Sequence, residues 1–117
     1  MTKEGYGMLI NYQYCTGCHS CDVACRKKND IPLGEWGIKL NEMGPWKIDH
    51  DPDHTTWEFD YVPVPMSLCD LCEDRLDQGM KPVCQVDCQA LVIEVAPVAE
   101  LAQRMLELGP KTAIYLP

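Results

Sequence analysis

The chain has 117 residues, of which 46% are hydrophobic, so it is long enough for one globular domain and too apolar for a disordered chain. Its net charge of −8 excludes the basic face that a nucleic-acid-binding protein needs. Nine prolines, eight glycines and a single phenylalanine predict a turn-rich fold with a small apolar core, while eight cysteines indicate covalent or metal cross-links.

The first half of the chain predicts a strand, a helix and a hairpin. Residues 7–12 are typical of a strand, and residues 22–28 of a short helix with basic residues in its last turn. In segments 35–46 and 56–65 apolar and polar residues alternate, as is typical of strands. We expect the two strands to pair as a hairpin around the acidic loop 47–56. The first strand should end at its Gly-Pro pair and the second at its prolines. We expect Trp36, Trp46 and Trp57 to pack this hairpin, or one of them to line an interface with a partner.

The second half predicts two helices and two extended segments. Residues 72–78 suit a helix that ends at Gly79, and the β-branched segment 90–95 suits a strand. Residues 97–110 carry the signals of a helix start and stop, and residues 111–117 form an apolar tail that either closes an edge of the fold or reaches another subunit. The expected packing face of the helix contains Val98, Leu101, Ala102, Met105 and Leu108.

The cysteines fall into two groups of four. The members are Cys15, Cys18, Cys21 and Cys25 in the first group, and Cys69, Cys72, Cys84 and Cys88 in the second. The first spacing is typical of cubane iron–sulfur clusters in bacterial ferredoxins. Three cysteines in a tight loop each bind one iron corner, and a helix that begins near the third carries the fourth to the other cluster.

This spacing predicts two [4Fe–4S] clusters with crossed ligands. The expected ligands are Cys15, Cys18, Cys21 and Cys88 for one cluster, and Cys69, Cys72, Cys84 and Cys25 for the other. The first spacing is not that of a zinc site, and a disulfide framework would need an oxidising compartment. A [3Fe–4S] centre usually lacks one ligand, and here none is missing.

Other residues carry weaker predictions. His19 either donates a hydrogen bond to a cluster sulfur or is an ordinary loop residue, and His50 and His54 either bind a metal or lie in a solvated loop. The aspartates beside these two histidines are Asp49, Asp51 and Asp53. The side chains that could offset cluster charge are those of Arg26, Lys27, Lys28 and Arg75. No nucleophile–base pair, phosphate loop or nucleotide fingerprint is found, so we expect no catalytic residue.

The start of the chain lacks a basic region followed by a long apolar run, and no run of eighteen apolar residues follows. We therefore expect a cytoplasmic protein without a membrane span, although a subunit can also be exported while bound to a signal-bearing partner. In the cytoplasm thiols stay reduced, which favours metal over disulfides.

Two stretches carry a family resemblance: "INYQYCTGCHSCDVACRKKNDIP" and "LCDLCEDRLDQGMKPVCQVDCQAL". They resemble the ferredoxin-like iron–sulfur subunits of dimethyl-sulfoxide-reductase-type molybdopterin or tungstopterin oxidoreductases, over residues 8–95. The resemblance implies the same crossed ligand sets. Larger family members carry two further cysteine motifs, but here residues 33–66 stand in their place and contain no cysteine. A second departure is Gln89, where the family usually has proline.

The resemblance implies an α+β fold, a ferredoxin-like bicluster domain over residues 1–117 with short strands and helices. An inserted hairpin or loop would occupy residues 33–66, and a C-terminal helix and extended tail residues 97–117. The implied function is electron transfer as the small subunit of an oxidoreductase whose catalytic site, with molybdopterin or tungstopterin, lies on another chain. The alternatives are a free, diffusible two-cluster ferredoxin and the electron-transfer subunit of a flavin-dependent oxidoreductase.

Overall fold

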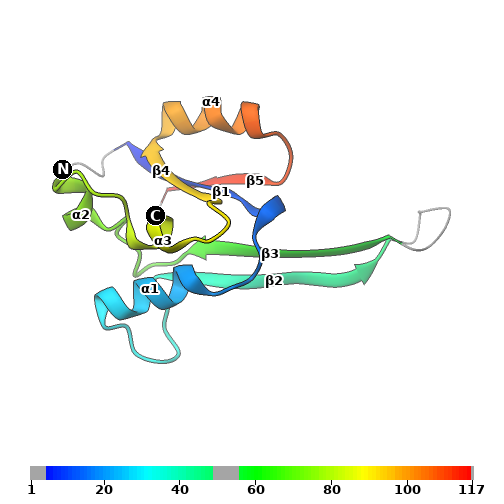
Figure 1. The fold of residues 1–117 in the computed structure, drawn as a ribbon, viewed down its shortest axis with the longest axis horizontal. Helices are drawn as coiled ribbons and strands as arrows, with labels where there is room; N and C mark the ends of the chain where they lie inside the picture. Colours follow the sequence, from blue (N-terminus) through cyan, green and yellow to red (C-terminus); the bar gives the residue numbers. More distant parts are fainter. Residues whose placement is uncertain (1–4, 49–55, 117) are drawn as a thin grey trace.

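The computed structural model describes residues 5–48 and 56–116. The molecule measures 52 × 35 × 22 Å, and its long axis follows a two-stranded hairpin that projects from a body of one sheet and several short helices (Figure 1). This is a small α+β arrangement compatible with a ferredoxin-like fold. Within the described ranges, no helix is both long and apolar enough to cross a membrane.

The sheet of the body has three antiparallel strands in the order β4-β1-β5. The central strand β1 (Tyr6–Asn11) confirms the first predicted strand, and its apolar residues are buried on both faces. The tail forms the edge strand β5 (Thr112–Tyr115), so its described part closes an edge of the sheet, which was one of the two alternatives predicted. Strand β4 (Ile93–Pro97) lies on the other side of β1.

The predicted strand over residues 90–95 is wrong in its first half, because the strand begins only at Ile93. Leu91 takes a left-handed conformation with φ of +57°, and its N–H donates to the carbonyl of Cys88 at 3.3 Å. The N–H of Val92 points at the Cys88 sulfur at 3.4 Å. The chain therefore turns around Cys88 before it can enter the sheet.

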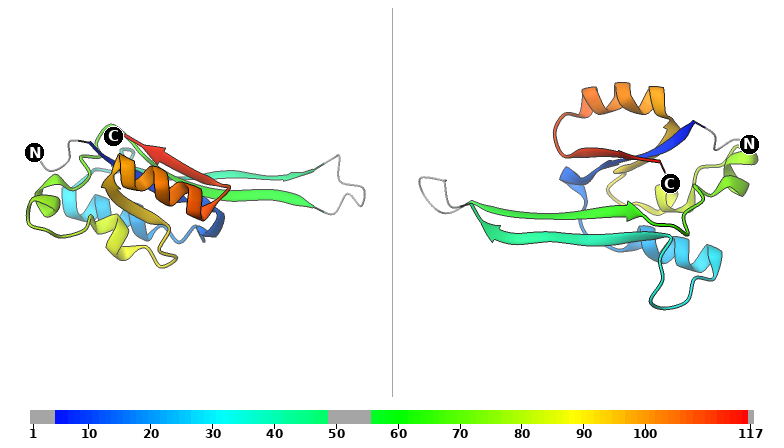
Figure 2. Two further views of the ribbon diagram at one scale, coloured as in Figure 1. Left: turned by 90° about the horizontal axis from the view of Figure 1, so that it is seen from above. Right: turned by 180° about the vertical axis from the view of Figure 1, so that it is seen from behind.

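Helix α4 (Val98–Leu108) covers one face of this sheet (Figure 2). Four residues of its predicted packing face are wholly or partly buried, with Leu101 only 2% exposed. Ala102 is exposed, so its place on that face is wrong. Because successive residues turn by about 100° around a helix, the residue after Leu101 lies at the flank of the buried stripe.

The other face of the sheet meets the remaining helices and the cysteines. Helix α1 (Ser20–Asn29) confirms the first predicted helix and packs on α3 (Val83–Asp87). Helix α2 (Glu73–Asp77) confirms the second and is followed by Gly79 with φ of +77°, as expected for a residue just past a helix end. A 3-10 turn, η1 (Tyr12–Tyr14), leads from β1 into the first cysteine group.

The projecting hairpin, which we call the arm, consists of β2 (Ile38–Lys47) and β3 (Trp57–Pro65). The prediction that the Gly-Pro pair ends the first strand is wrong. Met43 pairs with Asp60 and Trp46 with Glu58, so two residues of β2 oppose one of β3. This is the count of a β-bulge, where a strand accommodates glycine and proline without ending. Pro63 also lies inside β3, whereas Pro65 ends it as predicted.

The tryptophans do not pack the arm as predicted. Trp46 and Trp57 are 49% and 60% exposed on its strands. Trp36 is partly buried, with the ammonium of Lys39 4.4 Å and the guanidinium of Arg26 5.6 Å from its ring centre. Most of the predicted acidic loop, at 49–55, lies outside the described residues.

Candidate metal centre

The cysteines line two hollows between α1, α3 and the base of the arm. The first hollow is lined by Cys15, Cys18, Cys21 and Cys88, and the second by Cys25, Cys69, Cys72 and Cys84. The structure thus brings together the same two sets of four that the spacing predicts as ligands, each with cysteines from both sequence groups.

Two helices serve both hollows. Helix α1 presents Cys21 to the first hollow and Cys25 to the second. Helix α3 contains Cys84, which lines the second hollow, and is capped by Cys88, which lines the first. The crossing of the two sets follows from these helices, because each runs from one hollow to the other.

The loops around the hollows turn their backbone N–H groups toward sulfur. Burial raises the pKa of four of these thiols, and the N–H groups that partly offset this rise are those of Gly17 for Cys15, Asp22 for Cys21, Leu71 for Cys69 and Val83 for Cys72. The side-chain amide of Asn29 adds a donor 3.5 Å from the Cys25 sulfur. Such donors stabilise negative charge on thiolates and tune the potentials of iron–sulfur sites.

Burial acts on the thiols in the opposite direction. It raises the pKa of Cys21 to about 12, with help from the charge of Asp22, and raises the pKa of Cys69 to about 11. It raises the pKa of Cys84 further still. Buried thiolates therefore need a positive partner, which an iron core would supply.

Cys18 is the exception among these thiols. It is exposed, and a hydrogen bond with the Ser20 hydroxyl, whose oxygen lies 3.4 Å from the sulfur, lowers its pKa. The backbone N–H of Gln89 lowers it further. Proline has no N–H, so the departure at this position from the usual family residue adds a donor to the first hollow.

The geometry favours a cluster over a single ion. In residues 5–48 and 56–116, no three His, Cys, Asp or Glu side chains converge closely enough to hold one metal ion. A zinc ion needs its sulfur ligands about 2.3 Å from one point. All eight cysteines are free thiols, spread in fours around the two hollows, which suits a cluster that gives each thiolate its own iron.

The arm contributes walls that the sequence did not reveal. Leu40 and Pro63 line the first hollow, and Ile38 lines the second. A Cβ on Gly37 would collide with the Cys25 sulfur, and one on Gly17 would lie 2.9 Å from the Tyr61 ring. The sequence does not show that these two positions require glycine. The contact of Gly17 is with Tyr61, far away in the chain, and that of Gly37 is with a cysteine inside helix α1.

The secondary candidates have mixed outcomes. His19 lines the first hollow, but its Nδ1 lies 2.8 Å from the Asp22 carboxylate rather than on a sulfur. Lys28 bonds Asp74 at 2.9 Å, and its charge partly offsets the rise in the pKa of Cys72 that burial causes. The candidate ligands His50 and His54, with their neighbouring aspartates, lie outside the described residues.

The other candidate cations do not contact a sulfur. Arg26 donates from Nη1 to the carbonyl of Pro32 at 2.9 Å, and Arg75 donates from Nε to that of Lys81 at 2.7 Å. Lys27 is exposed. Four cations were expected to offset cluster charge. Among them, Lys28 acts electrostatically on a cysteine, Cys72.

Comparison with known proteins identifies subunits of reductases as relatives. The electron transfer subunit of the thiosulfate reductase of Salmonella typhi is 31% identical over 65 residues, which cover 56% of this chain and 32% of that protein. A polysulfide reductase subunit of Wolinella succinogenes is 38% identical over 52% of this chain and 29% of its own length. A subunit of the anaerobic dimethyl sulfoxide reductase of Escherichia coli is 20% identical over 89% of this chain and 78% of its own length.

The chain is a relative of the iron–sulfur subunits of dimethyl-sulfoxide-reductase-type enzymes. This confirms the resemblance seen in the two cysteine motifs. No protein-family model matches the chain. It spans less than a third of the length of the first curated relatives that it matches. The alignment with the Escherichia coli relative covers 162 positions, so this chain lacks residues that are present in that protein.

Proposed function

We propose that the chain transfers electrons through two [4Fe–4S] clusters, one in each hollow, as the small subunit of an oxidoreductase complex. The observation that carries the proposal is the division of eight free cysteines between two hollows with four thiols each. The relatives support it, since they are iron–sulfur and electron-transfer subunits of reductases by name.

The residues around the hollows have three tasks in this function. The eight thiolates hold the clusters, which exchange single electrons. The N–H donors stabilise negative charge on the sulfurs, and the apolar walls exclude water from most of each hollow. No catalytic residue is proposed on this chain.

The catalytic partner is a further element of the same proposal. We infer a larger chain that binds molybdopterin or tungstopterin, and a second redox protein that exchanges electrons with the complex. The support is the subunit names of the relatives, each of which denotes one component of a multi-subunit reductase. The cytoplasmic location stays a prediction.

Metal analysis and spectroscopy of the protein purified without oxygen test the cluster assignment. We expect about eight irons and eight sulfides per chain, and two reducible centres by electron paramagnetic resonance. Zinc without iron would overturn the redox function. Purification of the tagged chain from its own cells tests the subunit role: a chain that is always monomeric would instead be a diffusible ferredoxin.

A further inference from the structure

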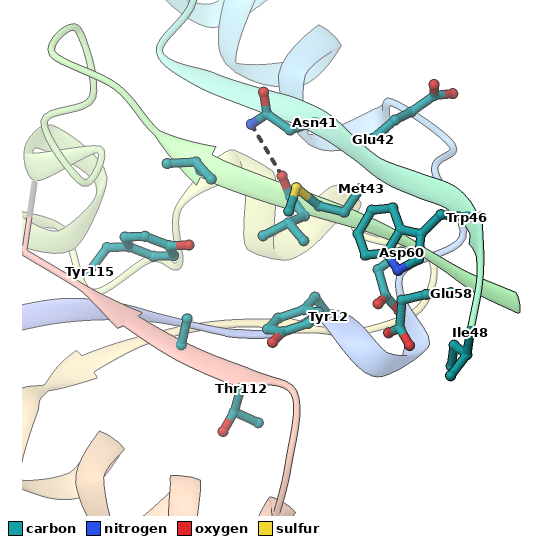
Figure 3. A pocket seen from close by; sticks show the side chains of 13 residues that line it. Tyr12, Asn41, Glu42, Met43, Trp46, Ile48, Glu58, Asp60, Thr112 and Tyr115 are labelled. Carbon is teal, nitrogen blue, oxygen red and sulfur yellow. Dashed lines mark hydrogen bonds between the residues drawn. The ribbon is translucent and has the colours of Figure 1, made fainter. Parts of the chain in front are cut away.

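An open groove runs between the arm and the edge of the body sheet (Figure 3). The arm contributes apolar side chains from both strands, among them Met43, Trp46 and Val62. The body contributes Tyr12 from η1 and Tyr115 from β5. Met43 and Trp46 are 47% and 49% exposed, so the groove presents large apolar side chains to its surroundings.

The arm has the features of an interaction surface. It has two strands, and a two-stranded hairpin is only marginally stable alone in water. Trp57 and Phe59 are also exposed, but they alternate along β3 with the groove residues Glu58 and Asp60 and so lie on its other face. Exposed apolar side chains gathered on one projecting element indicate an interaction surface.

The body side of the groove offers a strand edge. β5 is the outer strand of its sheet and pairs through one edge with β1. Thr112, Ala113 and Tyr115 of this strand line the groove. The free N–H and C=O groups of an edge strand are a template for an added extended segment.

Charge defines the occupant. Glu42, Glu58 and Asp60 line the groove, and Lys111 contacts two of them, at 2.9 Å from Glu58 and 3.0 Å from Asp60. Three carboxylates beside one ammonium leave the groove acidic, so it favours a basic side chain. A second copy of this chain, with net charge −8, would be repelled.

We propose that this groove binds an extended, basic and apolar segment of the catalytic partner chain, which lies alongside β5 and covers the groove face of the arm. The inference rests on the proposed function for the identity of the partner. The proposal also predicts which of the two hollows lies nearer to the partner segment. Leu40 and Pro63 are register partners that line the first hollow, while the next pair, Asn41 and Val62, lines the groove. The partner segment would therefore lie across one strand layer from the first hollow.

Site-specific photocrosslinking in the cells that produce the complex tests the proposal. A benzophenone amino acid replaces Met43 or Trp46 in the groove, and in matched controls it replaces the exposed apolar residues Leu33 or Leu106, which are 92% and 79% exposed. Mass spectrometry then identifies the linked peptide. We expect both groove positions to link one segment of the large subunit that contains Lys or Arg, and the controls not to link it.

Binding measurements on charge variants are the second arm of the test. Glu42→Lys reverses a groove charge, and Glu35→Lys makes the same change in net charge on an exposed loop residue outside the groove. We expect the first to weaken association with the isolated large subunit by about tenfold and the second by less than about twofold. Iron content and circular dichroism of each variant show that it is folded.

Each other result decides against the groove. Crosslinks from Met43 to a second copy of this chain, to an acidic segment or to nothing would overturn the assigned occupant. Equal binding by both charge variants would move the interface elsewhere and leave the proposed function intact. Isolation of the wild-type chain with two clusters and never with a partner would remove both the docking and the subunit role, while the electron-transfer function would stand.

Discussion

In the first hollow Cys18 is exposed, whereas in the second Cys25, Cys72 and Cys84 are all buried. Both hollows are lined by four thiols, so their surroundings make the difference. A short loop at Cys18 leaves that sulfur open, while Leu71, which is 3% exposed, helps to close the second hollow. We infer that the first hollow is the point of electron exchange and the second the shielded one.

The largest expected effect separates the two ligand sets. Cys25→Ser removes a thiol from the second hollow although Cys25 belongs to the first sequence group, and Cys88→Ser does the reverse. We expect each variant to retain about half of the iron, because one complete cluster remains. Paramagnetic resonance should show different surviving signals in the two. Loss of the same signal from both variants would contradict the crossed ligand sets.

The second effect is the pH dependence of cluster insertion. Raised pKa values, such as about 12 for Cys21 and about 11 for Cys69, keep the thiols protonated at pH 7, so binding as thiolates releases protons. Apparent affinity should rise with pH between 7 and 9, by about tenfold per pH unit for each proton released.

Cys18 has a lowered pKa, so the first hollow should depend on pH less steeply than the second. Titration of the metal-free chain with iron and sulfide at three pH values, followed by absorbance and resonance, measures both slopes. A steeper pH dependence of cluster insertion for the first hollow than for the second would contradict this prediction.

Two glycines offer a matched pair of smaller perturbations. Gly37→Ala pushes a methyl group against the Cys25 sulfur, so we expect the signal of the second hollow to change. Gly17→Ala, with φ of +74° and the Tyr61 ring 2.9 Å from the new Cβ, should change that of the first.

Gly79→Ala is the control for backbone strain, since its φ is +77° and its Cβ would meet nothing within 4 Å. It should lower the free energy of unfolding by about 1 kcal/mol and leave both cluster signals unchanged. If Gly17→Ala behaves like this control, the contact with the ring has no role in the first hollow.

The smallest effect concerns charge beside the second hollow. The charge of Lys28 opposes the rise in the pKa of Cys72 that burial causes, so its cation should also stabilise an added electron nearby. Lys28→Met should make the potential of the second cluster more negative and leave the first unchanged, while Lys27→Met, on the same helix but exposed, serves as control. Redox titration of each centre measures the shift; equal shifts in both centres would point to a general charge effect.

Local signals predicted the elements whose pattern is complete in the sequence. Helix α1 follows from its charges and stop signals, and α4 from its apolar periodicity with Pro97 before it and Gly109 after it. The expected cysteine sets, which the hollows bring together, follow from spacing alone. Three cysteines in one tight loop can reach only one cluster, and one turn of helix carries the fourth to the other.

Features that depend on contacts across the chain were not predictable. The Gly-Pro pair of β2 signals a stop, yet pairing with β3 absorbs it as a bulge. Residues 90–92 have strand composition, but the turn around the Cys88 sulfur prevails. Trp46 and Trp57 are apolar and were expected inside, because the sequence does not record which face of the arm has a neighbour.

Helix α1 also acts as a ruler. Cys21 and Cys25 are four residues apart on it, which at about 1.5 Å per residue sets their Cα atoms roughly 6 Å apart along the axis. The separation of the two hollows is therefore fixed by backbone geometry. Side chains on the surface can be replaced without altering it, whereas a single inserted residue between the two cysteines would rotate one of them about 100° away from its hollow.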